Sequence, residues 1–190
     1  YLKANYPAEF MAANLTNEIN DTKKFASYMD EVQAMGLELL APDVNSSDRY
    51  FSVKDGKIVY GMVGIKNVGV AAVDAIIAER TRGGPFRSFQ DFLARIDTTQ
   101  VNRKVIETGI MTGLFDKLHP NRHSLMHNLD YYMASASRDR EDTALGQVSL
   151  FGEEEAELSD EHMVEEVEEW PMRDRLEYEL QYLGRYFSGH

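Results

Sequence analysis

The chain contains no cysteine, and this absence excludes disulfide bonds and zinc sites built on cysteine. It also lacks the run of roughly 18 apolar residues that a membrane-spanning helix needs. No cationic and apolar start that ends in small residues is present, so we expect no secretory signal in these residues, although a fragment could have lost one. We therefore expect no membrane partner and a chain compatible with a reducing cytoplasm.

What the chain does contain is an ordinary globular composition, with 43% hydrophobic and 27% charged residues among 190. This content is enough for one core or two small ones. The chain begins with Tyr1 rather than methionine and stops at His190. We expect both ends to lie within a longer protein.

The formal net charge of -12 is unevenly distributed. Residues 1–48 carry three basic and eight acidic side chains, and residues 126–190 carry five basic and seventeen acidic ones. Residues 49–125 carry twelve basic and seven acidic side chains, a net charge of +5. A basic middle between acidic ends favours contact of the middle alone with a polyanion, although chance variation in surface charge gives the same totals.

Apolar residues at helical spacing predict a helical hairpin over residues 1–36. Pro7 suits a first helical position, Asp21 can cap the second helix, and Gly36 can end it. The two apolar stripes consist of Met11, Leu15 and Ile19, followed by Phe25, Val32 and Met35.

A short β-hairpin is predicted next, because Phe51 and Val53 alternate with polar residues and Asp55-Gly56 is a tight-turn pair. From residue 61 to about residue 136 the periodicity is helical again. Candidate N-caps in this stretch are Ser88, Asn102 and Asn121.

The amino-acid composition of the chain changes towards its end. Residues 152–169 contain ten acidic and no basic side chains, which predicts a mobile acidic linker. A last helix is expected over residues 173–186, with Leu176, Leu180 and Leu183 on one face. The predicted fold is mainly α, in the order helical hairpin, small β-hairpin, helical domain, acidic linker and short helix.

Residues 65–77 have the pattern of a helix-hairpin-helix, in which a short helix, a tight turn and a second helix follow one another. Gly69 allows a turn closed to other residues, and Asn67, where the usual form has glycine, tolerates a left-handed backbone. Free N–H groups at the start of the second helix can hold a phosphate without reading a base. The predicted DNA contacts are Lys66, Asn67, Val68, Gly69 and Val70; an ordinary helix-turn-helix corner is the alternative.

A second, looser copy of this pattern spans residues 103–122. In it Gly113 takes the role of Gly69, and Arg103, Lys104 and Arg122 would lie near a DNA backbone. Two hairpins in tandem would grip both strands across a minor groove. A plain α-hairpin is the alternative reading.

The pentapeptide Gln147-Val148-Ser149-Leu150-Phe151 stands just before the acidic stretch. Adjacent apolar residues in a polar and accessible segment indicate a partner's pocket. Gln147 can supply a directional hydrogen bond, while Leu150 and Phe151 fill apolar pockets. The alternative is that both side chains fold back onto the core.

Several ordered segments together resemble the alpha subunit of bacterial DNA polymerase III, and the resemblance covers the whole chain. The pentapeptide resembles the bacterial sliding-clamp motif Gln-x-x-Leu-Phe and falls where that family carries its internal clamp-binding loop. The segments that carry the resemblance are residues 1–13, 61–77, 101–107, 113–116, 147–151 and 183–190.

The resemblance implies a division of the chain into four parts. Residues 1–36 would be the end of the polymerase fingers, and residues 37–136 a tandem helix-hairpin-helix domain that binds DNA and the clamp. Residues 137–170 would hold the clamp-binding loop and acidic linker, and residues 171–190 would enter an oligonucleotide-binding barrel. The implied partners are duplex DNA, the sliding clamp (beta subunit) and the rest of the polymerase III holoenzyme, in the bacterial cytoplasm.

No catalytic residue is predicted here. Polymerase chemistry needs carboxylates close in space to hold two metal ions, and the sequence has no Asp-x-Asp pair. The family's carboxylates, with their magnesium, lie in a palm upstream, so we expect no cofactor here and no catalysis by this chain alone. Surface or packing roles, not metal ligation, are predicted for His119, His123, His127 and His162.

Two other functions use the same features. A glycosylase or lyase of DNA repair would need a catalytic Lys or Asp after the hairpin, and Asp91 and Asp97 are candidates by position. In a protein-interaction scaffold the hairpin would be only a corner. Salt-dependent DNA binding and a base-excision assay distinguish these readings.

Overall fold

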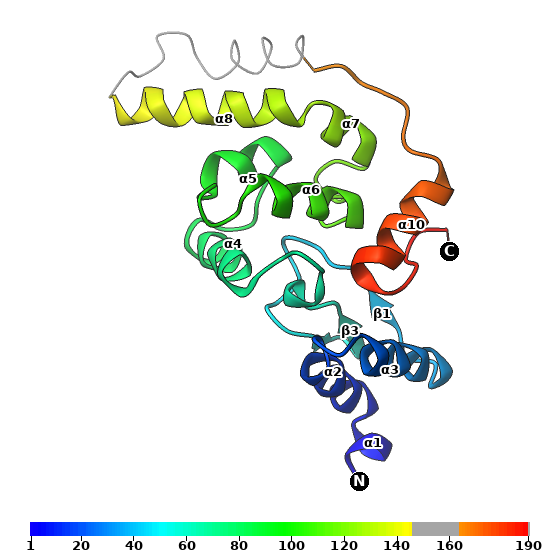
Figure 1. Ribbon diagram of the computed structural model, residues 1–190. Helices are drawn as coiled ribbons and strands as arrows, with labels where there is room; N and C mark the ends of the chain where they lie inside the picture. The colour runs from blue at the N-terminus through cyan, green and yellow to red at the C-terminus, as the bar shows by residue number, and fades with distance from the viewer. Residues whose placement is uncertain (146–163, 190) are drawn as a thin grey trace.

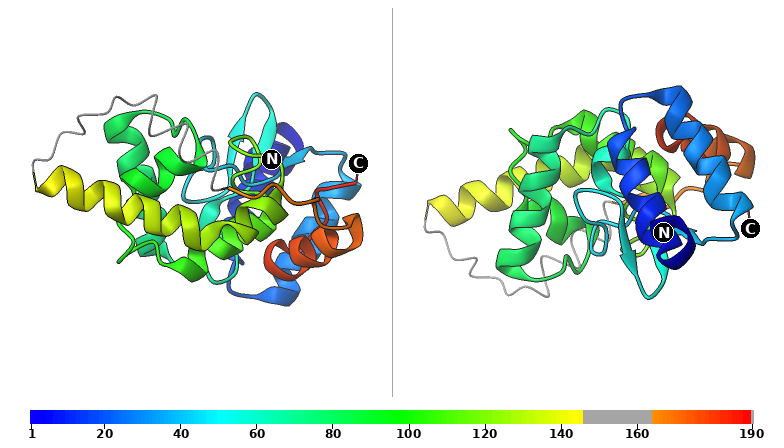
Figure 2. Two further views of the ribbon diagram at one scale, coloured as in Figure 1. Left: turned by 90° about the horizontal axis from the view of Figure 1, so that it is seen from above. Right: turned by 90° about the horizontal axis from the view of Figure 1, so that it is seen from below.

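The computed structural model describes residues 1–145 and 164–189, and it confirms a mainly helical fold with a small sheet (Figure 1). In Figure 1 the hairpin of α2 (Pro7–Asn17) and α3 (Thr22–Ala34) lies at one end of the molecule and α8 (Leu129–Ala144) at the other. Accordingly, α8 lies in front when the molecule is seen from above, and the hairpin lies in front when it is seen from below (Figure 2). The helices that follow the sheet lie between them.

The predicted helical hairpin is confirmed. Pro7 is the first residue of α2, and the Asp21 carboxylate accepts a hydrogen bond from Lys24 N at 3.0 Å, which caps α3. Gly36 follows α3 with φ +69°, a left-handed conformation that favours glycine. The helices of this region are α1 (Leu2–Asn5), α2 (Pro7–Asn17) and α3 (Thr22–Ala34).

The predicted β-hairpin is also confirmed, and a third strand joins it. Asp55 and Gly56 have φ values of +52° and +75°, as the tight turn between two antiparallel strands requires. The third strand has only two residues and pairs parallel to the hairpin, with Leu39 opposite Ile58. The strands are β1 (Leu39–Leu40), β2 (Ser52–Lys54) and β3 (Lys57–Val59), in the order β1-β3-β2.

The middle of the chain is helical, as predicted. Ser88, Asn102 and Asn121 each accept a backbone hydrogen bond at a helix start, at 2.9–3.1 Å. The elements are η1 (Met62–Gly64), α4 (Val70–Gly83), α5 (Phe89–Arg95), α6 (Arg103–Thr112), α7 (Arg122–His127) and α8 (Leu129–Ala144).

Two expectations for the end of the chain need correction. The helix predicted to end near residue 136 continues to Ala144 as α8. The predicted mobile linker is wrong for its last part, because residues 164–170, which we call the strap, run hydrogen-bonded beside α7 towards α10 (Figure 1). In α10 (Met172–Leu183), Leu183 is buried but Leu180 is exposed, so the predicted leucine face is only partly correct.

One continuous apolar cluster joins the N-terminal hairpin, the sheet, the middle helices and α10. Tyr60 lies at its centre with no exposed surface. Its ring is 4.7 Å from that of Phe51, 6.5 Å from that of Phe25 and 5.9 Å from that of Phe187, between centroids. Segments far apart in the sequence therefore meet around one aromatic side chain.

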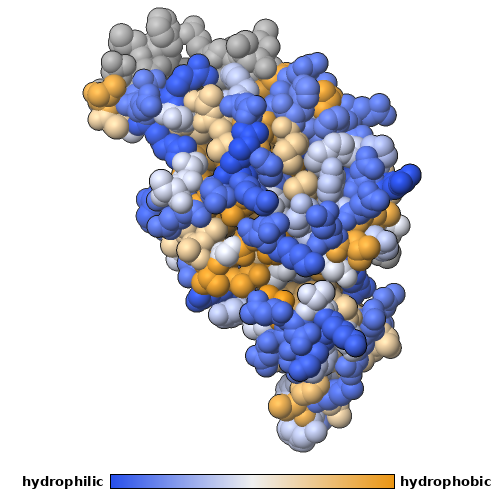
Figure 3. Space-filling view, in the orientation of Figure 1, coloured by the Kyte–Doolittle hydropathy of each residue, from blue (hydrophilic) through white to orange (hydrophobic). Residues whose placement is uncertain are grey.

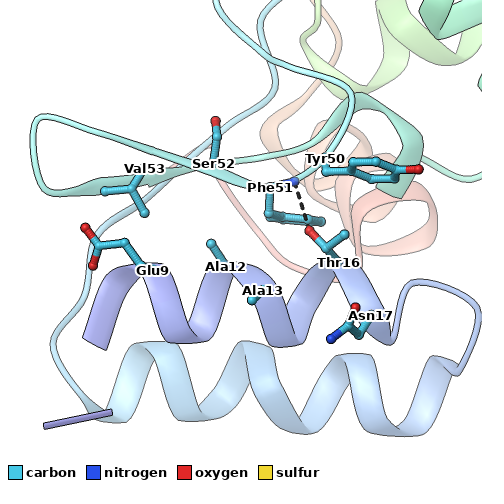
Figure 4. A pocket seen from close by; sticks show the side chains of 9 residues that line it. All are labelled: Glu9, Ala12, Ala13, Thr16, Asn17, Tyr50, Phe51, Ser52 and Val53. Carbon is cyan, nitrogen blue, oxygen red and sulfur yellow. Dashed lines mark hydrogen bonds between the residues drawn. The ribbon is translucent and has the colours of Figure 1, made fainter. Parts of the chain in front are cut away.

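The sheet is held to α2 at a shallow cleft of about 490 Å³ (Figure 4). Phe51 N donates a hydrogen bond to Thr16 Oγ1 at 3.2 Å across it, and Ala12 and Ala13 keep the helix surface low. Of the residues that line this cleft, Glu9 alone carries a charge.

Gly61 marks a close crossing of two backbone segments. A β-carbon at this position would lie 2.5 Å from Phe51 N and would also overlap the carbonyl carbon of Tyr50. Backbone atoms cannot move aside as a flexible side chain can, so the path of the chain into η1 depends on glycine here.

We therefore predict opposite outcomes for two glycine substitutions. Gly61→Ala should lower the free energy of unfolding by about 1–3 kcal/mol or more, since overpacking meets backbone atoms. Gly69→Ala should change it by less than about 0.5 kcal/mol, because no atom lies within 4 Å of its added β-carbon and its φ is -79°. Urea denaturation measures both, and equal midpoints would contradict this account of the crossing.

Candidate nucleic-acid interface

The first hairpin of the predicted DNA site is a short 3-10 turn, η1, followed by a tight turn and α4. Ile65 and Val68 are buried and anchor the turn to the core. The side chains between and after them, those of Lys66, Asn67 and Val70, are exposed. The turn therefore presents a short polar surface on an apolar base.

The left-handed residue in this turn is Asn67, with φ +67°, as its side chain type allows. The expectation that Gly69 supplies the unusual backbone conformation is wrong, because its φ of -79° and ψ of 164° are ordinary extended values. What Gly69 supplies is space, since no atom of the described residues beyond its two chain neighbours lies within 4 Å of the place a β-carbon would take. A ligand could approach the backbone there without meeting a side chain of another described segment.

Among the residues that the structure describes, no side chain caps the N-terminus of α4. In α3, α5, α6 and α7 a side-chain oxygen accepts one of the first backbone N–H groups, but at α4 the N-cap is Gly69, which has no such oxygen. The first N–H groups of a helix lack intrahelical acceptors and carry the positive end of the helix dipole. With Lys66 beside it, this helix start is suited to an anion.

The basic character of residues 49–125 does not itself make a binding face. Nine of the twelve cations in this segment form ion pairs, among them Arg49 with Asp74 and Arg82 with Glu79. Arg95 also donates to the carbonyls of Glu79 and Gly84 and closes the C-terminal end of α4. Within the described residues, the cations of this segment without an ion pair are Lys66, Arg87 and Lys104.

The second hairpin, α6 and α7, has a different surface from the first. Gly113 ends α6 in the left-handed conformation, with φ +86°, but it is buried. A β-carbon on it would overlap Arg122 and lie 2.8 Å from Asp116 Oδ2. Gly113 is thus needed for packing against an internal side chain, and the expectation that it faces DNA is wrong.

Arg122 is the centre of an internal ion-pair network and is only 4% exposed. Its Nη2 donates to Asp116 Oδ2 at 2.8 Å, and its Nη1 donates to Glu179 Oε2 at 2.9 Å. Glu179 has no exposed surface and also accepts from the backbone N–H groups of Phe187 and Ser188. The expectation that Arg122 contacts DNA is therefore wrong in this structure, because its donors are used inside the fold.

The charge states in this network follow from burial and hydrogen bonding. Burial raises the pKa of the Asp116 carboxyl, against the opposing effect of Arg122. Burial also acts to raise the pKa of Glu179, but the hydrogen bonds that it accepts from Ser188, Phe187 and Arg122 outweigh burial and lower it. Glu179 is therefore held as the carboxylate that Arg122 needs.

The strap closes the helix start of the second hairpin. The Glu169 carboxylate accepts hydrogen bonds from Arg122 N at 2.8 Å and His123 N at 3.1 Å, the first two N–H groups of α7. Asn121, Ser124 and Asn128 hold the strap through further bonds to its backbone. Since a carboxylate already occupies these donors, they are not available to a phosphate.

The remaining predicted contacts of the second hairpin lie at the start of α6. Arg103 pairs with Glu107 and Asp130, whereas the side chain of Lys104 is exposed and has no ion pair within the described residues. Of the second set of predicted contacts, Lys104 is thus the one whose charge remains available.

Asp91 and Asp97, the candidate catalytic residues of a repair enzyme, form hydrogen bonds with residues close to them in the sequence. Asp91 accepts hydrogen bonds from Arg87 N at 3.0 Å and from Arg95 at 3.1 Å. Asp97 accepts from Thr99 N and Oγ1, and the hydroxyl hydrogen bond lowers its pKa. Both residues thus support turns of the helical region.

The histidines of this region contact the strap. His119 lies 3.6 Å from Glu166, His127 lies 3.1 Å from Glu165, and the ring of His123 stacks on Trp170 at 5.4 Å. His162 lies outside the described residues. Within residues 1–145 and 164–189, no group of three histidine or acidic side chains is placed to hold a metal ion.

The predicted clamp motif, Gln147 to Phe151, also lies outside the described residues. It follows the end of α8 at Ala144 and precedes the strap. Hydrophilic residues dominate the face shown in Figure 3, with apolar ones in scattered patches. No helix in the described part of the chain is both long and apolar enough to cross a membrane.

Comparison with known proteins shows what this chain is homologous to. The family model of the helix-hairpin-helix motif matches residues 36–125, which include the first hairpin, the turn of the second, and the second hairpin as far as the middle of α7. The DNA polymerase III subunit alpha of Borreliella burgdorferi is 45% identical to this chain over 192 residues, covering 100% of the chain and 17% of that protein. This chain is homologous to a segment of the DNA polymerase III alpha subunit.

Other DNA polymerase III alpha subunits have a similar sequence identity to this chain. That of Treponema pallidum is 45% identical over 190 residues, and that of Escherichia coli K12 is 42% identical over 194 residues. Both alignments cover 100% of this chain, but only 16% and 17% of the relatives. The homology thus covers a small part of DNA polymerase III alpha, a part that contains the helix-hairpin-helix motif.

The burial of Arg122 leads to a stability prediction. Arg122→Met should lower the free energy of unfolding by about 3–5 kcal/mol, because Glu179 would remain buried without its cation. Arg103→Met removes two solvent-exposed ion pairs, with Glu107 and Asp130, and should cost less than about 1 kcal/mol. Chemical denaturation at neutral pH compares the two, and equal losses would show that Glu179 does not depend on Arg122.

Proposed function

We propose that this chain is a non-catalytic part of a replicative DNA polymerase that holds duplex DNA without regard to sequence and docks on a sliding clamp. The observation that carries the DNA contact is the uncapped start of α4, with Lys66 beside it and open space above Gly69. The homology to DNA polymerase III alpha supports duplex DNA as the anion.

The geometry of the first hairpin suits a phosphate of the DNA backbone. Backbone N–H groups at a helix start are fixed donors, and the helix dipole favours negative charge in front of them. Such contacts carry no sequence information, so binding should be similar for all duplexes. The strap closes the equivalent helix start of α7, so we assign the main contact to the first hairpin and a secondary one to Lys104.

The net charge of -12 opposes DNA binding, so the contact should be weak and sensitive to salt. Each neutralised phosphate releases condensed counterions, and affinity for non-specific sites then falls steeply as salt rises. Dissociation constants of roughly 10⁻⁴ to 10⁻⁶ M are usual for contacts of this kind.

Lys66→Glu should weaken duplex binding by roughly tenfold at low salt, equally for every sequence, and reduce the salt slope by about one. The control is Lys117→Glu, which makes the same change in charge in the turn before α7, where the strap closes the helix start. Fluorescence anisotropy over a range of salt concentrations measures both. Equal losses for the two variants would indicate a general charge effect and count against the first hairpin.

The clamp contact is the second part of the proposal, and the sequence of residues 147–151 supports it. An accessible segment loses entropy when it docks, so it needs concentrated apolar anchors. Leu150 and Phe151 could each contribute about 1.5–3 kcal/mol when buried in a pocket. A short anchor of this kind reaches roughly micromolar affinity, about -8 kcal/mol, and the DNA contact would add to it through effective concentration.

Replacing both Leu150 and Phe151 by alanine should abolish binding to a purified bacterial sliding clamp while the helical fold and DNA affinity persist. Leu145→Ala is the matched control, because this leucine is 75% exposed and lies outside the pentapeptide. Isothermal calorimetry measures both. Wild-type affinity in the double variant would remove the motif from the proposal.

A further inference from the structure

The turn of the first hairpin is held from behind by the last turn of α10. Lys66 N donates a hydrogen bond to the carbonyl of Tyr182 at 3.0 Å. The Tyr60 hydroxyl lies 2.8 Å from the carbonyl of Leu183 and 3.2 Å from that of Gly64. Lys66 within the phosphate-facing turn and Tyr60 just before it are therefore attached to a helix more than 100 residues away in the sequence.

Tyr60 is suited to connect the turn with α10 because it cannot move or ionise easily. Its ring is packed between those of Phe51 and Phe187, and it has no exposed surface. Burial raises the pKa of its hydroxyl far above the ordinary value, so the hydroxyl keeps its proton and remains a donor. The nearer carbonyl, that of Leu183, is its principal acceptor.

The helix that accepts the hydrogen bonds of Tyr60 and Lys66, α10, is itself fixed in place. Glu179, one turn before Leu183, forms the buried ion pair with Arg122 of α7. Gly184 ends α10 in the left-handed conformation, with φ +77°, and donates its N–H to Leu180 O. The carbonyls of Tyr182 and Leu183 are thus held by a helix that is itself anchored to the second hairpin.

We infer that α10 positions the first hairpin for DNA, and that Tyr60 is the positioning residue that transmits its placement to residues 64–69. The inference rests on the proposed DNA binding by this turn. A donor site that is already ordered before DNA arrives loses less entropy on binding than a mobile one. If α10 only stabilised the fold, loosening its contact with the turn would change stability without changing DNA affinity.

Two variants loosen this contact independently. Tyr60→Phe removes the hydroxyl and keeps the ring in place. Gly184→Ala strains the left-handed end of α10 from outside the core, since its β-carbon would make only ordinary contacts of 3.6–3.8 Å with the Phe25 ring. The matched control is Thr112→Val, which removes another buried hydroxyl, one that donates to Thr108 O at 2.8 Å in α6.

Two measurements on the whole chain test the inference. Hydrogen exchange of the Lys66 amide, followed without DNA, should be faster in Tyr60→Phe and Gly184→Ala than their global stability explains, and not so in Thr112→Val. DNA affinity at low salt should fall about two- to tenfold in the first two variants, the effect of one lost hydrogen bond, and stay within about twofold in the control.

The outcomes separate this inference from the proposed function. If the unmodified chain fails to bind duplex DNA at low salt, the proposed function fails, and this inference fails with it. If it binds, and the folded variants bind with wild-type affinity, only the positioning role of α10 is overturned. Should Tyr60→Phe fail to fold, Gly184→Ala decides, because its substitution lies outside the core.

Discussion

The buried ion pair between Arg122 and Glu179 is the interaction on which the placement of the two hairpins depends. It fixes α10 against the second hairpin, and the end of α10 then contacts the turn of the first. A buried carboxylate is tolerated only where donors surround it, and Glu179 is surrounded by a guanidinium, two backbone N–H groups and the Ser188 hydroxyl. Because these donors come from two distant parts of the chain, the pair also specifies how those parts meet.

The two hairpins share a chain pattern but differ at the helix that follows each turn. Both helix starts have backbone N–H groups that need an acceptor. At α7 the acceptors are the Asn121 side chain and the Glu169 carboxylate, whereas at α4 no side chain in the described part of the chain takes this place. An internal carboxylate thus completes one helix start, and the other remains free to accept an anion from outside. The difference makes the first hairpin the stronger candidate for a DNA contact.

The positively charged side chains of residues 49–125 likewise fall into two groups, those used inside the fold and those available to a partner. Most of those arginines and lysines neutralise acidic side chains or close helix ends, as Arg95 does for α4. A regional net charge therefore overstates the charge that a partner would meet. Lys66 matters more than the total, because it has no ion pair among residues 1–145 and 164–189 and stands beside an open helix start.

Features set by a few neighbouring residues could be predicted from the sequence. Asp21, Ser88, Asn102 and Asn121 cap helices because each reaches an N–H only three residues away, and Asp55-Gly56 forms its turn for equally local reasons. The left-handed Asn67 belongs to this group, and so does the helix-hairpin-helix pattern that agrees with the family match.

Features that depend on distant partners could not be predicted in this way. The pairing of β1 with β3 needs a neighbour about 19 residues on, and two residues carry too weak a pattern to reveal it. The acidic composition of the strap indicated mobility, but its glutamates meet N–H groups and histidines that only the folded α7 presents.

The sequence by itself determined where the side-chain-capped helices begin, where the chain turns at Asp55-Gly56, and which family it resembles, because these depend on local hydrogen bonding and on residue order. Only the tertiary structure decided which cations are available. Arg122 and Lys66 look alike in the sequence, yet Arg122 is paired with a buried carboxylate 57 residues away and Lys66 faces solvent. Burial and pairing are properties of the folded environment, and they determine which charge can meet a ligand.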